Sequence, residues 1–228
     1  MAKEDVKLLG LRLHPLVNRV QFGLNLKSIE YEFIEEKFPS KSDLLLKSNP
    51  IYQDVPVLIH GDKPVCDCNA IVQYIDEAWN SGPSILPSDR YDRAIARFWV
   101  AYIEEKWYPL VKEVRAAQGD EALREASERV VEGLVVLEKA FEKISKGKSF
   151  FGGENIGYID LALGCYLGWL RATEEMNGVK LFHGENTPRL AEWAERFCCH
   201  DAVKGVLPET EVIVELAKRL QAMSPPPK

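Results

Sequence analysis

Residues 55–79 read VPVLIHGDKPVCDCNAIVQYIDEAW, and this stretch decides how the first third of the chain folds. The apolar run at its start is too short for a helix and is closed by glycine and proline, which predicts a strand, a turn and a second strand. Apolar residues recur at spacings of three and four between residues 71 and 79, which predicts a helix. Asp67 stands where that helix begins, and an acidic side chain there satisfies free amides and suits the positive helix end. The stretch begins with the Val55-Pro56 peptide bond. This bond is a candidate for the cis form, because cis costs little free energy in X-Pro bonds compared with other peptide bonds.

The preceding residues extend the same mixed pattern. Residues 6–11 predict an apolar strand, followed by a helix that begins at Pro15, because the fixed φ of proline suits the first helical position. Residues 30–35 alternate aromatic and charged side chains with the period of a half-buried strand. Residues 42–46 predict a short helix. The order β-α-β-α-β-β-α is that of a compact α/β domain with right-handed crossovers.

Turn-forming residues are concentrated at 81–90, which predicts a linker between a domain at 1–80 and a domain at 91–228. The second domain is helical in pattern throughout. Its expected helices cover residues 91–117, 121–144, 158–169, 187–197 and 209–223, followed by a free tail at 224–228. Pro109 is expected to kink the first of these helices or to remove a hydrogen bond from it. Asp160 is expected to cap the start of the helix at Tyr158.

The composition of the 228 residues is that of an ordinary globular protein, with 46% hydrophobic and 28% charged residues. The net charge is -6 and there is no basic run, so nucleic acid and anionic membrane surfaces are not expected partners. No apolar run reaches the roughly 18 residues that a membrane helix needs. The charged start, residues 1–5, does not predict a secretory signal.

The chain has five cysteines, an odd number with poor spacing for a disulfide framework: Cys66, Cys68, Cys165, Cys198 and Cys199. This usage indicates a reducing compartment and predicts a cytoplasmic protein. Cys66 and Cys68 lack a second pair of ligands, so no metal is expected.

Several motifs in the same order resemble the cytosolic glutathione transferases, and within them the plant tau class. The segments that carry the likeness are VKLLG at 6–10, PLVNRV at 15–20, KSDLLL at 41–46, residues 49–60, YIDE at 74–77, and FFGG at 150–153 running into GYID at 157–160. They span nearly the whole chain. The resemblance implies a thioredoxin-like N-terminal domain and an all-helical C-terminal domain. It also implies a homodimer between the α/β domain of one chain and the helical domain of the other.

The family holds glutathione extended on the thioredoxin-like domain, where a hydroxyl at the start of the first helix donates to the thiolate. The thiolate then attacks an electrophile that is held by the helical domain. The glutathione-site positions of this chain are His14, Lys41, Asp54, Val55, Asp67 and Cys68. Lys41 matches the family lysine, and Val55 retains a role through its backbone.

Two substitutions in this set change its chemistry most. His14 replaces a serine of the tau class, and the helix N-terminus favours a neutral imidazole at pH 7. Such a histidine either donates to a thiolate, acts as a general base on another substrate, or marks a site without activity. Asp54 replaces a lysine that meets the glycine carboxylate of glutathione. Exchanging attraction for repulsion in a partly wet site weakens affinity on the order of a hundredfold.

The helix start at Asp67-Cys68 is altered as well. Asp67 retains the charge of the family glutamate on a shorter arm, whereas Cys68 lacks the hydroxyl of the family serine. Cys68 is either a passive replacement or a reactive thiol, although Asp67 opposes its ionisation. Together the substitutions argue against ordinary glutathione binding, even though the resemblance names glutathione as the co-substrate.

The substrate side of the cleft is expected between the domains, where an apolar surface with a few polar groups suits a small molecule. The expected positions of this hydrophobic substrate site are Leu11, Leu13, Trp107, Val111, Arg115, Trp169 and Leu207. Tyr108 is expected to face the reactive centre. Arg12 is expected to pair with an acidic ligand or with Asp54. Core packing is the alternative for the aromatic residues, Trp107 among them.

Three functions follow from these residues. The first is glutathione-independent chemistry on a hydrophobic small molecule, an isomerisation, cyclisation or elimination, in which His14, Tyr108 and Arg12 are the catalytic groups. The second is conventional glutathione conjugation with weak glutathione binding. The third is a non-catalytic carrier of a hydrophobic ligand.

Overall fold

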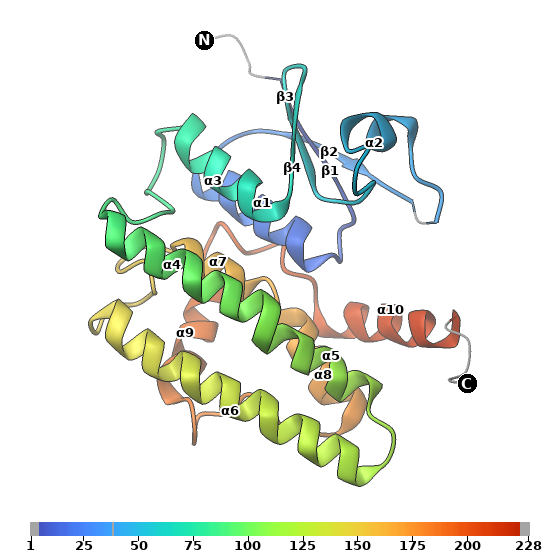
Figure 1. Ribbon diagram of the computed structural model, residues 1–228, viewed down its shortest axis with the longest axis vertical. Coiled ribbons are helices and arrows are strands. Elements are labelled where there is room, and N and C mark those ends of the chain that lie inside the picture. Colours follow the sequence, from blue (N-terminus) through green and yellow to red (C-terminus); the bar gives the residue numbers. More distant parts are fainter. Residues whose placement is uncertain (1–4, 38, 224–228) are drawn as a thin grey trace.

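The computed structural model describes residues 5–37 and 39–223. The charged segment at residues 1–4 and the predicted tail at 224–228 lie outside the described residues. Figure 1 shows a small α/β layer at one end of the molecule and a larger group of helices at the other. This confirms the predicted fold class, an α/β domain followed by a helical region.

The α/β layer is built on a four-stranded sheet with the order β2-β1-β3-β4. Its strands are β1 Val6–Gly10, β2 Glu32–Glu35, β3 Val57–His60 and β4 Lys63–Cys66. The strand β1 pairs parallel to β2 and antiparallel to β3, and β3 pairs antiparallel to β4. In the register, Leu8 lies between Phe33 and Leu58. Leu8 and Leu58 have no exposed surface, so the middle of the sheet is part of the hydrophobic core.

Three helices complete this layer: α1 Pro15–Leu26, α2 Asp43–Ser48 and α3 Cys68–Ala78. The Ser42 hydroxyl accepts a hydrogen bond from the Leu45 amide at 3.1 Å, which fixes the start of α2. The Val55-Pro56 bond is cis, as its sequence context suggested.

The helices of the C-terminal region are α4 Arg90–Tyr102, α5 Tyr108–Ala116, α6 Asp120–Ser145, α7 Tyr158–Gly164, α8 Leu167–Asn177, α9 Pro188–Cys198 and α10 Thr210–Met223. A π-helical segment, η1 Ile103–Trp107, lies between α4 and α5. The predicted irregularity at Pro109 is therefore present, because proline lacks the N–H that would continue the α-helical ladder. Among residues 5–37 and 39–223, no helix combines the length and the apolar character that a bilayer span requires.

The single helix predicted from Tyr158 through Trp169 is wrong. The chain forms two helices, α7 and α8, which meet at Cys165 and Tyr166. The Tyr166 amide donates to Leu163 three residues back, at 3.2 Å, which tightens the turn and ends α7. The apolar pattern continues across this junction, so hydrophobic periodicity does not reveal it.

Residues 79–89 carry neither helix nor strand, and they connect α3 to α4. The Asp76 carboxylate holds this segment by accepting the amides of Ile85 at 2.8 Å and Leu86 at 2.9 Å. It also pairs with the buried ammonium of Lys27 at 2.8 Å. The domain boundary at 81–90 remains a prediction.

The two layers are joined by a buried polar network around Arg19 of α1. Its guanidinium pairs with Glu104 of η1, and it donates to Asn69 of α3 at 3.0 Å and to the Ala162 carbonyl of α7 at 3.3 Å. The Tyr158 hydroxyl donates to the same Asn69 oxygen at 3.0 Å. This network therefore fixes α1 and α3 against the helical region.

Asp160 organises the start of α7, as predicted, and reaches further than a helix cap. Its carboxylate accepts the amide of Gly157 at 2.8 Å and the amides of Phe151 and Gly152 at 2.9 Å each. The indole of Trp193 in α9 donates to it at 2.7 Å. Asp160 has no exposed surface, so water does not replace its carboxylate as the hydrogen-bond acceptor of these four donors.

Asp160→Asn is expected to lower the free energy of unfolding by roughly 3–5 kcal/mol, because one amide oxygen replaces two and the new NH2 group faces buried donors. Urea denaturation followed by far-UV circular dichroism measures the change. Asp62→Asn, in an exposed turn, is the matched control and should stay within about 0.5 kcal/mol of the parent. Equal stability of the two variants would contradict this assignment.

Candidate functional site between the two layers

His14 lies at the entrance to α1. Its backbone is extended, with φ -86° and ψ 121°, and its carbonyl accepts the amide of Val17 at 3.0 Å. The imidazole makes no capping hydrogen bond to the helix, and its Nδ1 is buried with no hydrogen-bond partner among residues 5–37 and 39–223. The histidine therefore does not serve the helix start, and Pro15, which has no N–H, needs no cap at the first position.

The electrostatic surroundings of His14 keep its ring neutral. Burial lowers the pKa of His14 below its ordinary value of 6.5, the nearby carboxylate of Asp54 raises it, and the nearby ammonium of Lys112 lowers it. The net shift is downward because desolvation is the largest of the three effects. At pH 7 the ring has one nitrogen that donates and one that accepts, so it is able to move a proton in either direction.

Asp54 occupies the loop before β3. Its Oδ1 accepts the amide of the next residue, Val55, at 2.8 Å, and its carbonyl accepts the side-chain amide of Asn49 at 2.9 Å. The Val55 N–H is the group that the resemblance assigns to an extended ligand. In this structure that donor is already bonded to the side chain of Asp54.

The start of α3 is also committed to internal contacts. Asp67, at φ +72°, accepts the amide of Ala70 at 2.9 Å and so caps the helix. The Cys68 thiol donates to the Leu16 carbonyl of α1 at 3.3 Å, and burial raises the pKa of Cys68 to about 12. The thiol is therefore protonated at pH 7 and turned inward, which disfavours a nucleophilic role. Lys41 is half-buried directly before α2.

Three features of these positions differ from what the resemblance implies for glutathione binding. The backbone donor at Val55 is taken, a carboxylate stands at the position of the family lysine, and the Cys68 thiol points away from the surface. A ligand carboxylate placed near Asp54 would meet repulsion rather than attraction.

The helical wall beside His14 consists of aromatic and cationic side chains of α5 and α8. Tyr108 stacks on Tyr166 with the ring centres 3.7 Å apart. Burial raises the pKa of Tyr108 to about 12 although the neighbouring Arg115 lowers it, so its hydroxyl is protonated at pH 7. The Arg115 guanidinium lies 4.6 Å from the ring centre of Trp169. Trp169 in turn donates through its indole to the Leu13 carbonyl at 3.0 Å, and this bond ties the wall to the residue before His14.

Leu11 and Leu207 are half-buried and pack at the edge of the main core, whereas two other predicted lining residues are inside it. Trp107 is 1% exposed, and its indole donates to the Val130 carbonyl of α6 at 3.3 Å. Val111 has no exposed surface. The prediction that Trp107 and Val111 line the cleft is therefore wrong, because both side chains are inside the packed helical layer.

The expectation that Arg12 pairs with Asp54 is also wrong. The Arg12 guanidinium pairs with Glu35 of β2 at 3.2 Å and lies 5.1 Å from the ring centre of Phe33. Its side chain is 68% exposed. The contacts with β2 turn Arg12 toward the sheet edge. Its pairing with an acidic ligand and its catalytic role stay predictions.

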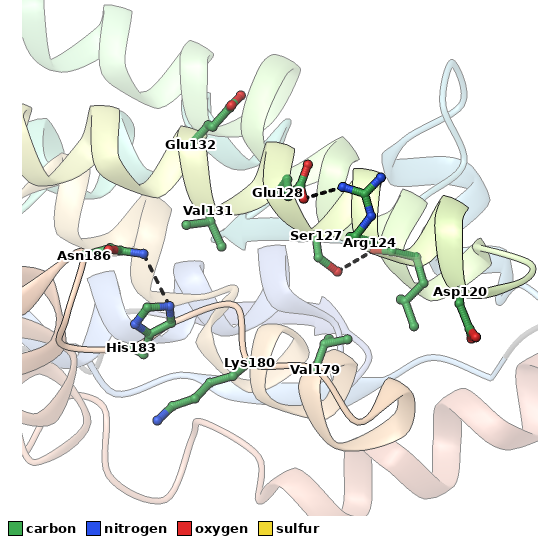
Figure 2. A pocket seen from close by; sticks show the side chains of 11 residues that line it. Asp120, Arg124, Ser127, Glu128, Val131, Glu132, Val179, Lys180, His183 and Asn186 are labelled. Atoms are coloured by element: carbon green, nitrogen blue, oxygen red, sulfur yellow. Dashed lines mark hydrogen bonds and ion pairs between the residues drawn. The ribbon is translucent and has the colours of Figure 1, made fainter.

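A separate cavity of about 660 Å³ opens on the outside of the helical layer, between α6 and the segment after α8 (Figure 2). Several of its polar side chains interact with one another. The Arg124 guanidinium forms an ion pair with Glu128 at 2.7 Å, and Nδ2 of Asn186 lies 3.5 Å from Nε2 of His183. None of the residues that the sequence singled out lines this cavity.

Sequence reasoning missed Lys112. This residue influences the pKa of His14, and its ammonium lies 5.1 Å from the ring centre of Tyr108. The spacing contained a usable signal, because Lys112 lies four residues after Tyr108 and three before Arg115, so all three share one face of a helix.

Comparison with known proteins gives the family. Residues 4–77 match the model "Glutathione S-transferase, N-terminal domain", and residues 120–196 match "Glutathione S-transferase, C-terminal domain". Glutathione S-transferase U17 of Arabidopsis thaliana is 54% identical over 96% of this chain and 97% of its own length. The tau-class glutathione S-transferase of mango, Mangifera indica, is 59% identical, covers 96% of this chain and 100% of its own, and superposes with a TM-score of 0.92. A rice transferase whose structure was solved in complex with glutathione is 32% identical to this chain. It covers 99% of this chain and 100% of its own length, with a TM-score of 0.89.

The architecture is thus that of a two-part transferase with a thioredoxin-like sheet and a helical region. The chain belongs to the tau class of the glutathione S-transferase family.

The titration of His14 tests the site electrostatics. Its NMR midpoint is expected below 6.5. Asp54→Asn should lower it further, because the carboxylate stabilises the imidazolium, and Lys112→Gln should raise it, because the ammonium destabilises the imidazolium. A folded pKa below the unfolded one means that folding stability decreases as pH drops below about 6.5, and a His14→Ser variant should show a smaller decrease. Shifts of the opposite sign in the two charge variants would refute this arrangement.

Proposed function

We propose that this protein binds a hydrophobic small molecule between its two layers and transforms it without consuming glutathione. The observation that carries the proposal is the state of the Val55 amide, which is bonded to Asp54 rather than free for an extended peptide. The same carboxylate lies close enough to His14 to influence its pKa. A site with this electrostatic character suits proton transfer on a substrate better than stabilisation of a thiolate.

In this proposal His14 is the acid–base group. It is neutral at pH 7, and Asp54 favours the imidazolium that forms when the ring accepts a proton. Tyr108 is protonated and presents a hydroxyl donor. Proton removal at one carbon and proton return at another would give an isomerisation, while loss or attack of an internal group would give an elimination or cyclisation.

Conventional conjugation is the second candidate, because the names of the relatives favour it. A protein 54% identical to this chain is named a glutathione S-transferase. In this case the neutral imidazole of His14 would donate its N–H to the thiolate in place of the hydroxyl, and Asp54 would make glutathione binding weak.

The two candidates differ in their need for glutathione. A thiol-depleted plant extract should be incubated with the protein and analysed by mass spectrometry, with and without added glutathione. The proposal predicts that a hydrophobic compound is converted without glutathione and that His14→Ala slows the conversion at least about a hundredfold, the usual range for loss of an acid–base group. Products that form only with glutathione would favour conjugation, and full turnover by His14→Ala would eliminate the first candidate.

We also propose that two copies of the chain assemble and that the protein works in the cytoplasm. The family suggests contact between the α/β layer of one copy and the helical layer of the other. Two exposed aromatic groups support this pairing: Tyr52 before β3 is 75% exposed and Phe98 of α4 is 60% exposed. Covering a large exposed apolar side chain with a partner is favourable, because it removes apolar surface from water. All five cysteines are free thiols, which fits a reducing compartment.

Tyr52→Glu and Phe98→Asp are each expected to shift the protein from dimer to monomer in light scattering after size exclusion, because each places a charge at an apolar contact. Val136→Asp, on the exposed face of α6, is the control and should leave the mass unchanged. A monomeric parent protein would refute the assembly.

A further inference from the structure

We infer that Cys198 and Cys199 form a two-thiol site for a monosubstituted trivalent arsenical, a compound that carries one organic group on arsenic. The two residues lie at the C-terminal end of α9, outside the site between the two layers. The inference goes beyond the proposed function, because it concerns a covalently held ligand of another chemical class.

The five cysteines, all of which lie in the described part of the chain, differ in how far their thiols are committed. Those of Cys66, Cys68 and Cys165 each donate to a backbone carbonyl, at 3.4, 3.3 and 3.4 Å. Cys68 and Cys165 are also buried. Cys199 is exposed, and its neighbour Cys198 is half-buried. A reagent in water therefore meets two adjacent thiols at the end of α9.

The backbone at this pair suits a bridging atom better than a disulfide. Adjacent Cα atoms are about 3.8 Å apart, whereas the Cα atoms of a disulfide are usually about 4.4–6.8 Å apart. Cys199 retains a helical backbone, with φ -81° and ψ -6°, and both cysteines are free thiols. One atom inserted between the two sulfurs lengthens the bridge by one bond. Arsenic can therefore join these neighbours where a direct sulfur–sulfur bond would distort the helix end.

The number of ligands also matches this class of compound. A trivalent arsenic atom that carries one carbon forms two further bonds, and soft acceptors of this kind prefer sulfur. The next residue, His200, uses its Nδ1 to accept the amide of Ala202 at 3.1 Å. Among residues 5–37 and 39–223, no group of three or more His, Cys, Asp or Glu side chains is arranged to hold a metal ion. Two thiols alone suit an acceptor that needs two ligands, unlike zinc, which takes four.

The exchange at arsenic needs neither an oxidant nor a reductant. The hydrated arsenical, R–As(OH)2, reacts with two protein S–H groups to give R–As(S–protein)2 and two water molecules. Two As–O and two S–H bonds break, two As–S and two O–H bonds form, and arsenic stays trivalent. Burial raises the pKa of Cys198, while the neighbouring Arg171 of α8 lowers it, and the net shift is upward. The guanidinium thus favours the thiolate during attack without holding Cys198 ionised.

Phenylarsine oxide is the probe for this site. The full chain is incubated with one equivalent at pH 7 and then with increasing 2-mercaptoethanol, a competing monothiol, and intact-mass spectrometry counts the bound phenylarsenic groups. The parent protein should retain one group, with loss of two protein hydrogens. Cys198→Ser and Cys199→Ser should each lose it at a monothiol concentration on the order of a hundredfold lower, because the second sulfur bond is intramolecular.

Cys66→Ser, which removes a thiol outside the pair, is the control and should retain the group as the parent protein does. Far-UV circular dichroism checks that each variant is folded, and Cys198→Ala replaces Cys198→Ser if the serine is not tolerated. Release from the parent protein as easily as from the two variants would overturn the inference. Retention by either variant would also overturn it, because a thiol outside the pair would then complete the bridge.

Discussion

The structure depends on one buried charge, the guanidinium of Arg19, which has no exposed surface. Removing such a cation from water costs several kcal/mol, and only good geometry with further hydrogen bonds offsets the cost. Here Glu104 supplies the countercharge, while Asn69 and the Ala162 carbonyl accept further N–H groups. These partners belong to η1, α3 and α7, so one side chain of α1 is bonded both to its own layer and to the helical layer.

The functional site inherits its geometry from this constraint. His14 lies one residue before the first turn of α1, so fixing α1 through Arg19 also fixes the imidazole opposite α5. The bond from Trp169 to the Leu13 carbonyl adds a second attachment on the same side of His14. The two sides of the site therefore carry opposite charges at fixed positions, the carboxylate of Asp54 on the α/β side and the ammonium of Lys112 on the helical side. In the function that we propose, the carboxylate of Asp54 disfavours glutathione on the α/β side of the site.

Local patterns made much of the fold predictable. Three examples are the alternation at residues 30–35, the turn after His60 and the proline at the start of α1. In each case the backbone conformation is favoured by the residues at that place in the sequence. The junction of α7 and α8 was not predictable in this way, because its residues are apolar on both sides of the turn. Residue contacts were harder still. The resemblance places Trp107 and Arg12 in the cleft, whereas packing against α6 buries Trp107 and an ion pair with Glu35 holds Arg12.

The most direct test of the altered site is calorimetric titration of glutathione into the parent protein and into Asp54→Lys. The account predicts no saturable binding by the parent protein in the micromolar to low millimolar range. Asp54→Lys should bind glutathione on the order of a hundredfold more tightly, because the exchange removes the repulsion and frees the Val55 amide. Ordinary saturable binding by the parent protein would contradict the claim that Asp54 has closed this site to glutathione.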